Sequence, residues 1–329
     1  MAPLIITSGD PAGIGPEIAL RAAISSQGDI VLMGCPHHLE QVASKTGIKI
    51  DLEVITEADL GRLEPAPNRL PILPIIWAET PKAGHPDPRN AEQIIRSISD
   101  ATALAQSGRA AGIVTSPIAK SVLYESGFGY PGHTEFLASL DNDATPVMML
   151  ANAQLRVVPL TIHIPLHQVA SAIDPDLLMN TLTIMNDGLK RYFGISVPHI
   201  AVAGLNPHSG ENGHIGNEEA ERIMPAIERA RQAGIEVTSP LPADTLFHPD
   251  MRKTYDSVLC MYHDQALIPV KTLDFYGSVN ITLGLSFIRT SPDHGTAFDR
   301  ADQFTSRPDS LIAAIQLARK MANTASMTS

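Results

Sequence analysis

A chain of 329 residues is too long for one small core and fits two domains of ordinary size, with a cleft between them as the default ligand site. The formal net charge is −11, with 24 basic and 35 acidic residues and no basic block, which argues against a nucleic-acid surface. Cys35 and Cys260 form no C-x-x-C pair, so no disulfide framework or zinc knuckle is expected. The N-terminal apolar run is too short for a signal peptide and no apolar stretch approaches membrane-spanning length, so the sequence predicts a soluble cytoplasmic protein.

The first part of the chain alternates predicted strands and helices. An apolar run at 4–8 leads through the glycine-rich string GDPAGIGPE into a helix. Pro16 and Glu17 suit the first turn of that helix, where a missing N–H is harmless and a carboxylate meets the helix dipole. Alternating β and α elements indicate a mostly parallel sheet. The further elements expected here are strands at 30–33, 72–76 and 112–115 and a helix at 90–106.

A second series begins near Pro146. Its predicted strands are 147–152, 155–162, 199–204, 235–238 and 257–261, and its helices are 175–192 and 217–232. The stretch 277–289 alternates and carries Thr and Ile, which predicts a strand near a cleft wall. A last helix at 309–322 is expected to fold back onto the first domain, and 324–329 to fray. The sequence therefore predicts an α/β protein with a first domain of 1–135 plus 304–329 and a second of 136–303.

Three histidines lie where an apolar strand-like run gives way to a loop: His163, His208 and His263. Ligands of open α/β sheets bind beyond the carboxyl ends of the strands, so imidazoles arriving there from three strands could converge on one ion. A single histidine at a strand end is more often a hydrogen-bonded loop residue. The repetition of this setting favours a metal-assisted enzyme.

Two turns carry polar side chains suited to anions or nucleotides. In GYPGHTEF, His133 and Thr134 stand beside a carboxylate in a glycine-flanked turn that suits a phosphate, although Thr134 could equally cap the helix that follows. In DHGTA, a loop with His294, Gly295 and Thr296 could approach a nucleotide closely, or be only a turn.

For the remaining candidate residues, a functional role and an ordinary structural role explain the sequence equally well. Lys271, Asn280 and Arg289 are spread across a predicted loop and strand, where the two cations would suit a phosphate or carboxylate, or would simply be solvated. Asp244 could assist a metal, orient a histidine or act as a base, but a turn around Pro242 explains the pattern as well. The string GDPAGIGPE matches neither the dinucleotide nor the phosphate-loop pattern, so a tight turn is the better reading.

Taken together, these strings resemble the 4-hydroxythreonine-4-phosphate dehydrogenase family of the vitamin B6 pathway. The matching strings run in order over nearly the whole chain: GDPAGIGPE, PGHTEF, LRVVPLTIHIPL, GLNPHSGENGHIG, LPADTLF, MYHDQ, VNITLGLSFIRTS and DHGTA. The resemblance implies an isocitrate/isopropylmalate-dehydrogenase-like fold, with two α/β domains flanking a cleft. It also implies a homodimer whose active sites use residues of both subunits, with the metal ligands and the dimer interface in the second domain.

The resemblance further implies the chemistry. A divalent metal, most commonly zinc, with magnesium, cobalt or manganese as alternatives, would be held by the three histidines. From the residue pattern, Asp244 is the candidate catalytic residue. NAD or NADP would accept a hydride beside 294–296. The substrate, 4-phosphooxy-L-threonine, would be oxidised at C3 and lose CO2 to give 3-amino-2-oxopropyl phosphate. The residues implied to hold this phosphorylated substrate are His133, Thr134, Lys271, Asn280 and Arg289.

Two departures from the family pattern leave alternatives open. Ala119 stands where many relatives carry histidine, and the segment after Ala297 lacks the usual glycines, so the choice between NAD and NADP is undetermined. The substrate could instead be threonate or erythronate 4-phosphate, or a dihydrodiol carboxylate. From other classes, three histidines with an open position also suit a metallohydrolase, or a non-catalytic metal binder.

Overall fold

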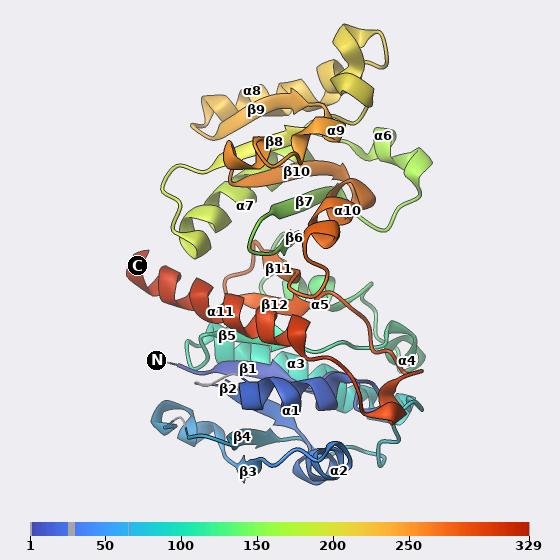
Figure 1. Ribbon diagram of the computed structural model, residues 1–329, viewed down its shortest axis with the longest axis vertical. Helices are drawn as coiled ribbons and strands as arrows, with labels where there is room; N and C mark the ends of the chain where they lie inside the picture. Colours follow the sequence, from blue (N-terminus) through green and yellow to red (C-terminus); the bar gives the residue numbers. More distant parts are fainter. Residues whose placement is uncertain (1, 26–29, 65, 329) are drawn as a thin grey trace. The chain divides into compact units, whose positions relative to one another are not determined.

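The computed structural model describes residues 2–25, 30–64 and 66–328 and shows a mixed α/β chain of two compact units (Figure 1). Unit 1 comprises 1–146 and 285–322, and unit 2 comprises 147–284 and 323–329. The boundaries thus fall after Pro146 and Gly284 rather than after 135 and 303. One reason is that the helix beginning at His133 packs on a helix of unit 1, which keeps the segment up to 146 with that unit.

Unit 1 is built on a parallel sheet with strand order β3-β4-β2-β1-β5-β12. The central strand β1 reads LIIT and is buried along its whole length, as expected for a strand covered on both faces. The strands of this unit are β1 (Leu4–Thr7), β2 (Ile30–Gly34), β3 (Asp51–Val54), β4 (Arg69–Pro74), β5 (Gly112–Thr115) and β12 (Arg289–Pro292).

Helices cover both faces of this sheet. In Figure 1, α1 and α11 lie in front of the strands and α3 lies behind them. α2 ends in a left-handed cap at Gly47, whose φ of 68° only glycine adopts without cost. The helices are α1 (Gly15–Ser25), α2 (Pro36–Thr46), α3 (Ala91–Gln106), α4 (Lys120–Glu125), α5 (His133–Leu140) and α11 (Asp309–Thr328), the last of which belongs to unit 1 as far as Ala322.

Unit 2 has a mixed sheet with strand order β11-β6-β7-β10-β8-β9, antiparallel at β11, β6 and β7 and parallel from β7 to β9. The carboxyl ends of β7, β10 and β8 therefore share one edge of the sheet. The strands are β6 (Val147–Ala151), β7 (Arg156–Thr161), β8 (His199–Ala203), β9 (Glu236–Leu241), β10 (Ser257–Tyr262) and β11 (Val279–Leu283).

The helices of unit 2 also pack on both sides of their sheet, with α10 in front of the strands and α7 behind them in Figure 1. The side chain of Asp174 caps α7 by accepting hydrogen bonds from the backbone N–H groups of Asp176 and Leu177. The helices are α6 (Val169–Ala172), α7 (Pro175–Phe193), α8 (Met224–Gln232), α9 (Ala243–Leu246) and α10 (His263–Leu273).

Three local predictions are wrong. The single strand expected at 277–289 is two strands, β11 and β12, separated by a bend that includes Gly284 with a φ of 86°. The segment 324–328, expected to fray, continues α11. Lys271, expected in a loop, lies in the last turn of α10, because Pro269 does not end this helix. The return of α11 to the first unit is confirmed, since Thr290 donates its hydroxyl to the carbonyl of Ala314 at 2.9 Å.

Candidate functional site

Two of the three predicted metal-ligating histidines meet at the carboxyl edge of the unit 2 sheet. His163 follows the end of β7, and His263 is the first residue of α10, directly after β10. β7 and β10 are adjacent parallel strands, so both residues leave the same edge, and their ring centroids are 5.9 Å apart. With Thr161, Tyr262 and Asp264 they line a pocket that is open to solvent.

Asp264 fixes the orientation of one of these rings. Its Oδ1 lies 2.7 Å from Nδ1 of His263. A carboxylate can only accept, so Nδ1 carries the proton, and in the neutral ring the lone pair is then on Nε2. A carboxylate behind a ligand histidine is the usual arrangement of metal sites, because it sets the tautomer and raises the basicity of the free nitrogen. The predicted patterns did not single out Asp264, although it stands in the string MYHDQ.

The third histidine lies apart from this pair. His208 follows β8 in the 3₁₀ segment η4 (Pro207–Gly213), with 66% of its side chain exposed. Its Nδ1 is 4.0 Å from Oε2 of Glu211. Among the described residues of one chain, no group of three or more His, Cys, Asp or Glu side chains is placed to hold a metal ion. A single chain thus brings together two of the three imidazoles.

Both loop histidines adopt backbone conformations that L-residues rarely take. φ is 50° at His163 and 51° at His208, and the left-handed conformation continues through residue 212. Such a conformation costs about 1 kcal/mol or more per residue and persists only where the surroundings hold it. Asn206 helps to hold η4, since its N–H and its Nδ2 both donate to the carboxylate of Glu219, at 2.7 and 2.9 Å. Strain of this kind is typical of functional loops.

The other predicted residues of unit 2 lie on separate elements. Asp244 is exposed in α9, which packs beside η4. The ammonium of Lys271 lies 5.6 Å from the ring centroid of Phe275. Asn280 lies in β11, and its Oδ1 is buried with no hydrogen-bond partner in the described part of the chain. An amide oxygen left unpaired in this way can accept a hydrogen bond from a ligand or water.

Unit 1 contains a buried cation beside a neutral imidazole. Arg289 is 4% exposed and donates from Nη2 to the hydroxyl of Thr115 at 2.9 Å. Burial lowers the pKa of Arg289 to about 10, and Glu135 partly offsets this, so the guanidinium stays charged at neutral pH. Burial, then the charges of Arg289 and Lys120, hold the pKa of His133 well below its usual range, and the ring is neutral. The buried Nε2 of His133 has no partner among the described residues.

Lys120 was not predicted to belong to this cluster, whereas Glu135 is the carboxylate of the predicted turn. A Cβ built on Gly132 would lie 3.2 Å from Cε of Lys120 and 3.3 Å from Oε2 of Glu135, so both side chains crowd the turn that carries His133. Gly132 is also the N-cap of α5, which corrects the suggestion that Thr134 caps this helix. Lys120 directly follows Ala119, the buried N-cap of α4. The cluster combines two cations with one carboxylate and a neutral histidine, and its net positive charge suits an anion.

The predicted cofactor segment lies against the glycine-rich loop of unit 1. The N–H of Ile14 donates to the carbonyl of Thr296 at 3.0 Å, and a Cβ on Gly13 would approach that same oxygen to 2.9 Å. His294 and Gly295 are exposed beside it, with Nδ1 of the histidine 3.1 Å from the glycine carbonyl. The contact with Gly13 shows why a side chain cannot stand at that position without moving the loop.

Asp10 anchors the turn of this loop. Its Oδ1 accepts from the N–H of Ala12 at 3.0 Å, whereas Oδ2 is buried without a partner among the described residues. Burial raises the pKa of this carboxyl to about 6, although the hydrogen bond from Ala12 opposes the rise. The loop thus carries a carboxyl group that changes charge near neutral pH.

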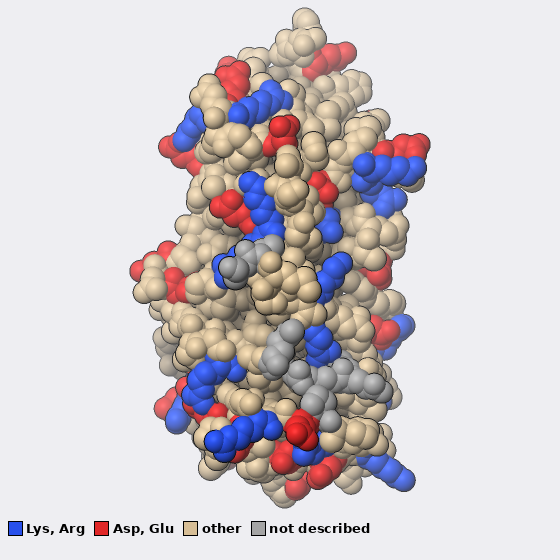
Figure 2. Space-filling view, turned by 90° about the vertical axis from the view of Figure 1, so that its left-hand side faces the viewer, with Lys and Arg blue, Asp and Glu red and all other residues tan. Residues whose placement is uncertain are grey.

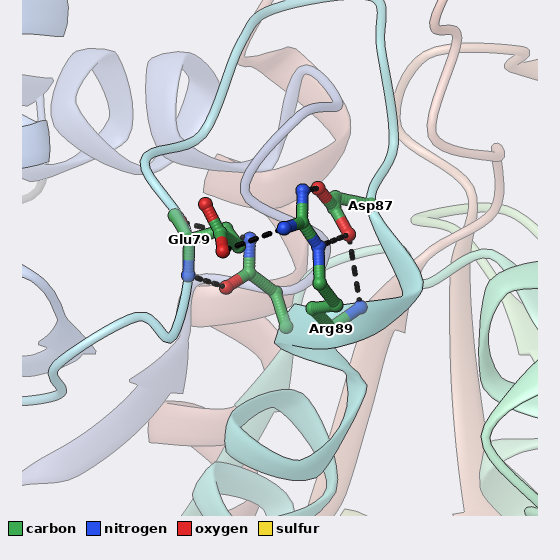
Figure 3. A network of polar contacts seen from close by, with 4 residues as sticks. Glu79, Asp87 and Arg89 are labelled. Atoms are coloured by element: carbon green, nitrogen blue, oxygen red, sulfur yellow. Dashed lines mark hydrogen bonds and ion pairs between the residues drawn. The ribbon is translucent and has the colours of Figure 1, made fainter.

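A polar network orders the neighbouring segment that precedes α3 (Figure 3). Arg89 binds Oδ2 of Asp87 at 2.6 Å and Oε1 of Glu79 at 2.7 Å. The hydrogen bonds from Arg89 lower the pKa of Asp87. This segment touches the glycine-rich loop, since the N–H of Gly84 donates to the carbonyl of Ala12 at 2.8 Å. The exposed ion pairs contribute little free energy individually but define the path of the segment.

On the surface, basic and acidic side chains are interspersed over the face drawn in Figure 2, and no extended basic patch appears there. None of the helices in the described residues is long and apolar enough to cross a membrane.

A two-unit α/β chain with oriented histidines at strand ends and a separate anion site has the features of an enzyme acting on a small anionic molecule. Comparison with known proteins makes this more specific. The family described as pyridoxal phosphate biosynthetic protein PdxA matches residues 26–318, so the chain belongs to that family, and it is an oxidoreductase.

Its relatives match over nearly their full length. The chain is 48% identical over 328 residues to the 4-hydroxythreonine-4-phosphate dehydrogenase of Paracoccus denitrificans, covering 97% of this chain and 98% of the relative. It is 49% identical to the enzyme of the same name from Caulobacter vibrioides, covering 97% of each. The crystal structure of 4-hydroxythreonine-4-phosphate dehydrogenase from Klebsiella pneumoniae superposes with a TM-score of 0.91 at 38% identity, over 98% of this chain and 100% of that one. The predicted fold class and family are confirmed.

Proposed function

We propose that this chain catalyses the NAD(P)-linked oxidation of 4-hydroxythreonine 4-phosphate, followed by decarboxylation to 3-amino-2-oxopropyl phosphate, in pyridoxal phosphate biosynthesis. The names of the relatives support the substrate. The observation that carries the proposal is the pair His163 and His263 in an open pocket, with Asp264 bound to the ring of His263. We place the reaction in the cytoplasm, where a pathway of small phosphorylated metabolites would run.

The donor set fits a divalent metal. Zinc prefers imidazole ligands, and cobalt and manganese can also bind to them. Here two imidazole rings lie close together, and a carboxylate binds one of them on the side away from its free nitrogen. We propose that His163, His208 and His263 hold the ion, with Asp264 setting the tautomer of His263. One chain brings two imidazoles together, and we propose that a second copy of the chain, in a homodimer, supplies the third. When bound, the metal would polarise the C3 alcohol oxygen of the substrate.

The anion site of unit 1 suits the substrate's charged groups. Arg289 gives a fixed positive charge, and Nε2 of the neutral His133 is available for a hydrogen bond with a phosphate oxygen. We propose that Thr134, Lys271 and Asn280 complete substrate binding. Lys120 adds a second cation that the resemblance did not include. Binding energy at the phosphate, remote from C3, would hold the reacting carbon in position.

The oxidation requires three transfers from the substrate. The C3 hydride passes to the nicotinamide, the alcohol proton passes to a base, and the resulting 3-oxo acid releases its carboxyl group as CO2 with protonation of the adjacent carbon. We propose Asp244 as the base, supported by its exposed position on α9 beside the loop of His208. We propose that His294, Gly295 and Thr296 contact the cofactor, which is supported by their exposed loop against Gly13.

A dehydrogenase of this fold could also act on a different substrate. A terephthalate 1,2-cis-dihydrodiol dehydrogenase from Burkholderia xenovorans has a TM-score of 0.67 at 27% identity. The buried Arg289 and its neutral histidine neighbour favour a phosphorylated substrate over a diol, but threonate or erythronate 4-phosphate would satisfy the same site. A metallohydrolase would use the same histidines to activate water and would need no nicotinamide.

A spectrophotometric assay separates these functions. The purified chain is mixed with NAD or NADP and each of the phosphorylated hydroxy acids, before and after chelation and metal restoration, and reduced nicotinamide is followed by absorbance. We expect 4-hydroxythreonine 4-phosphate to give the highest kcat/KM, with activity lost on chelation and regained with zinc, cobalt or manganese. Release of inorganic phosphate without cofactor reduction would establish the hydrolase instead, and full activity of a His208→Ala variant would exclude that ligand.

A further inference from the structure

A second pocket lies within unit 1 beside the predicted cofactor segment. It is lined by parts of the glycine-rich loop, α2, the loop at 81–83 and the segment at 301–304. We call it the Lys45–Lys82 pocket after its two cations. Gly13, which lines it, also lies against Thr296, so the pocket adjoins the loop that we propose to contact the cofactor.

The pocket is locally positive in a strongly acidic chain. Lys45 lies in the last turn of α2 with its ammonium 5.0 Å from the ring centroid of Phe304, a cation–π arrangement that keeps the side chain at the pocket wall. Neither Lys45 nor Lys82 makes an ion pair with a carboxylate among the described residues. Glu17 also lines the pocket, but Arg21 binds its Oε1 at 2.9 Å and balances its charge.

Two side chains that line the pocket also carry a buried acceptor atom without a donor among the described residues. His38 is 8% exposed, and its Nε2 lies 3.2 Å from the carbonyl of Pro11. A carbonyl can only accept, so Nε2 carries the proton and Nδ1 is a bare acceptor, buried with no partner in the described chain. Burial lowers the pKa of His38 to about 4, which keeps the ring in this neutral form. Oε2 of Glu17 is likewise buried and unpartnered among the described residues.

We propose that the Lys45–Lys82 pocket binds the phosphorylated adenosine end of NADP and thereby makes this chain prefer NADP to NAD. The two ammonium groups pair with the 2′-phosphate, the Phe304 ring and the neighbouring prolines contact the apolar faces of the adenosine, and His38 and Glu17 accept from its amino or hydroxyl groups. NAD has a hydroxyl in place of that phosphate and leaves the ammonium groups without a partner. The inference rests on the proposed nicotinamide-linked oxidation.

The test is a calorimetric titration of the full chain with adenosine 2′,5′-bisphosphate and with adenosine 5′-monophosphate, which report on the pocket without any turnover. We expect the bisphosphate to bind more tightly, and the difference to shrink as salt is added. Lys45→Ala and Lys82→Ala should each weaken the bisphosphate by about fivefold, the upper range for an exposed ionic contact. Lys45→Arg should restore the affinity. Lys49→Ala, an exposed lysine beyond α2 that does not line the pocket, is the matched control.

Three results would overturn the inference. The two nucleotides could bind equally well, or neither alanine variant could alter binding of the bisphosphate. NADP could also fail to displace the bound bisphosphate, which would show that the pocket binds a free nucleotide instead. If NADP displaces the bisphosphate while no phosphorylated hydroxy acid is oxidised, the pocket assignment holds and the proposed reaction fails. Thermal melting of the variants checks that loss of the Lys45–Phe304 contact leaves unit 1 folded.

Discussion

The buried carboxyl group of Asp10 makes the stability of unit 1 depend on pH in an unusual direction. Asp10 is 2% exposed, and burial raises its pKa from the ordinary 3.8 to about 6. The folded chain therefore holds this proton more tightly than the unfolded chain does. The associated stability is fully present below pH 3.8 and is lost as the pH rises through about 6.

Replacing Asp10 with asparagine removes this loss. Each pH unit between the folded and unfolded pKa values corresponds to about 1.4 kcal/mol, so the ionised carboxyl costs about 3 kcal/mol above pH 6. The amide oxygen that Asp10→Asn introduces keeps the bond from Ala12, while the new amide nitrogen takes the place of the unpartnered Oδ2. Its burial costs about 1–2 kcal/mol, but equally at every pH. At pH 4, slightly above the ordinary pKa of 3.8, about 0.5 kcal/mol of this cost is already present, so the gain of Asp10→Asn at pH 8 should exceed that at pH 4 by about 2.5 kcal/mol.

The single tryptophan of the chain makes this measurable. Trp77 is 8% exposed in the core of unit 1, so its fluorescence during urea denaturation reports on the unit that contains Asp10. Wild type and Asp10→Asn are compared at pH 4 and pH 8. Asp143→Asn, which removes an exposed carboxylate of the same unit, is the control for net charge.

Equal effects of Asp10→Asn at both pH values would refute the reasoning, because a carboxyl that does not titrate between them has no raised pKa. A variant that loses stability at pH 8 relative to pH 4 would show that the ionised carboxylate is stabilised, by a water or ion that pairs with Oδ2. Either result would also show that the Asp10 carboxyl does not change its charge near neutral pH in the folded chain.

Three further predictions concern the two sites and the loop. Asp264→Asn should weaken zinc binding by about 10–100-fold in chelator competition, because the amide no longer fixes the tautomer of the neighbouring ring, whereas the exposed Asp250→Asn should not. Lys120→Ala should raise KM for the phosphorylated substrate about fivefold and leave kcat largely unchanged, with arginine restoring KM; a fall in kcat alone would contradict a binding role. Gly9→Ala should lower the melting temperature far more than Gly47→Ala, since φ is 69° and 68° at the two sites but only the Cβ at Gly9 would lie 2.3 Å from a backbone oxygen.

Much of the fold follows from short buried runs. β1, β5 and β10 are continuous apolar segments, buried throughout apart from Tyr262, and each was predicted within a residue or two of its observed bounds. Such strands lie at the centre of their sheets, where both faces are covered and few polar residues interrupt the pattern. The exposed edge strand β3 was not predicted, because DLEV carries charges that local pattern assigns to a loop.

Side-chain clusters were harder to predict than elements. Lys120 and Glu135 stand 15 residues apart, and their proximity depends on the absence of a side chain at Gly132 rather than on any spacing rule. Asp264 is adjacent to its histidine, yet adjacent residues in a helix do not normally face each other. Here the histidine opens α10, so its backbone lies at the helix start and the two side chains can meet.

The three histidines show which part of the metal site could be predicted from the ends of strands. Because β7, β10 and β8 are parallel neighbours, the segments that carry His163, His263 and His208 all leave the same edge of the sheet. The first two lie within a few residues of their strands, and their rings meet. His208 lies beyond a further turn of left-handed backbone, held by Asn206 and Glu219, and a sheet edge no longer dictates where that ring points. If zinc binding by the purified chain depends on protein concentration in the range where dimers form, the third imidazole comes from a second copy; a metal bound equally well by the monomer would require η4 to rearrange within one chain.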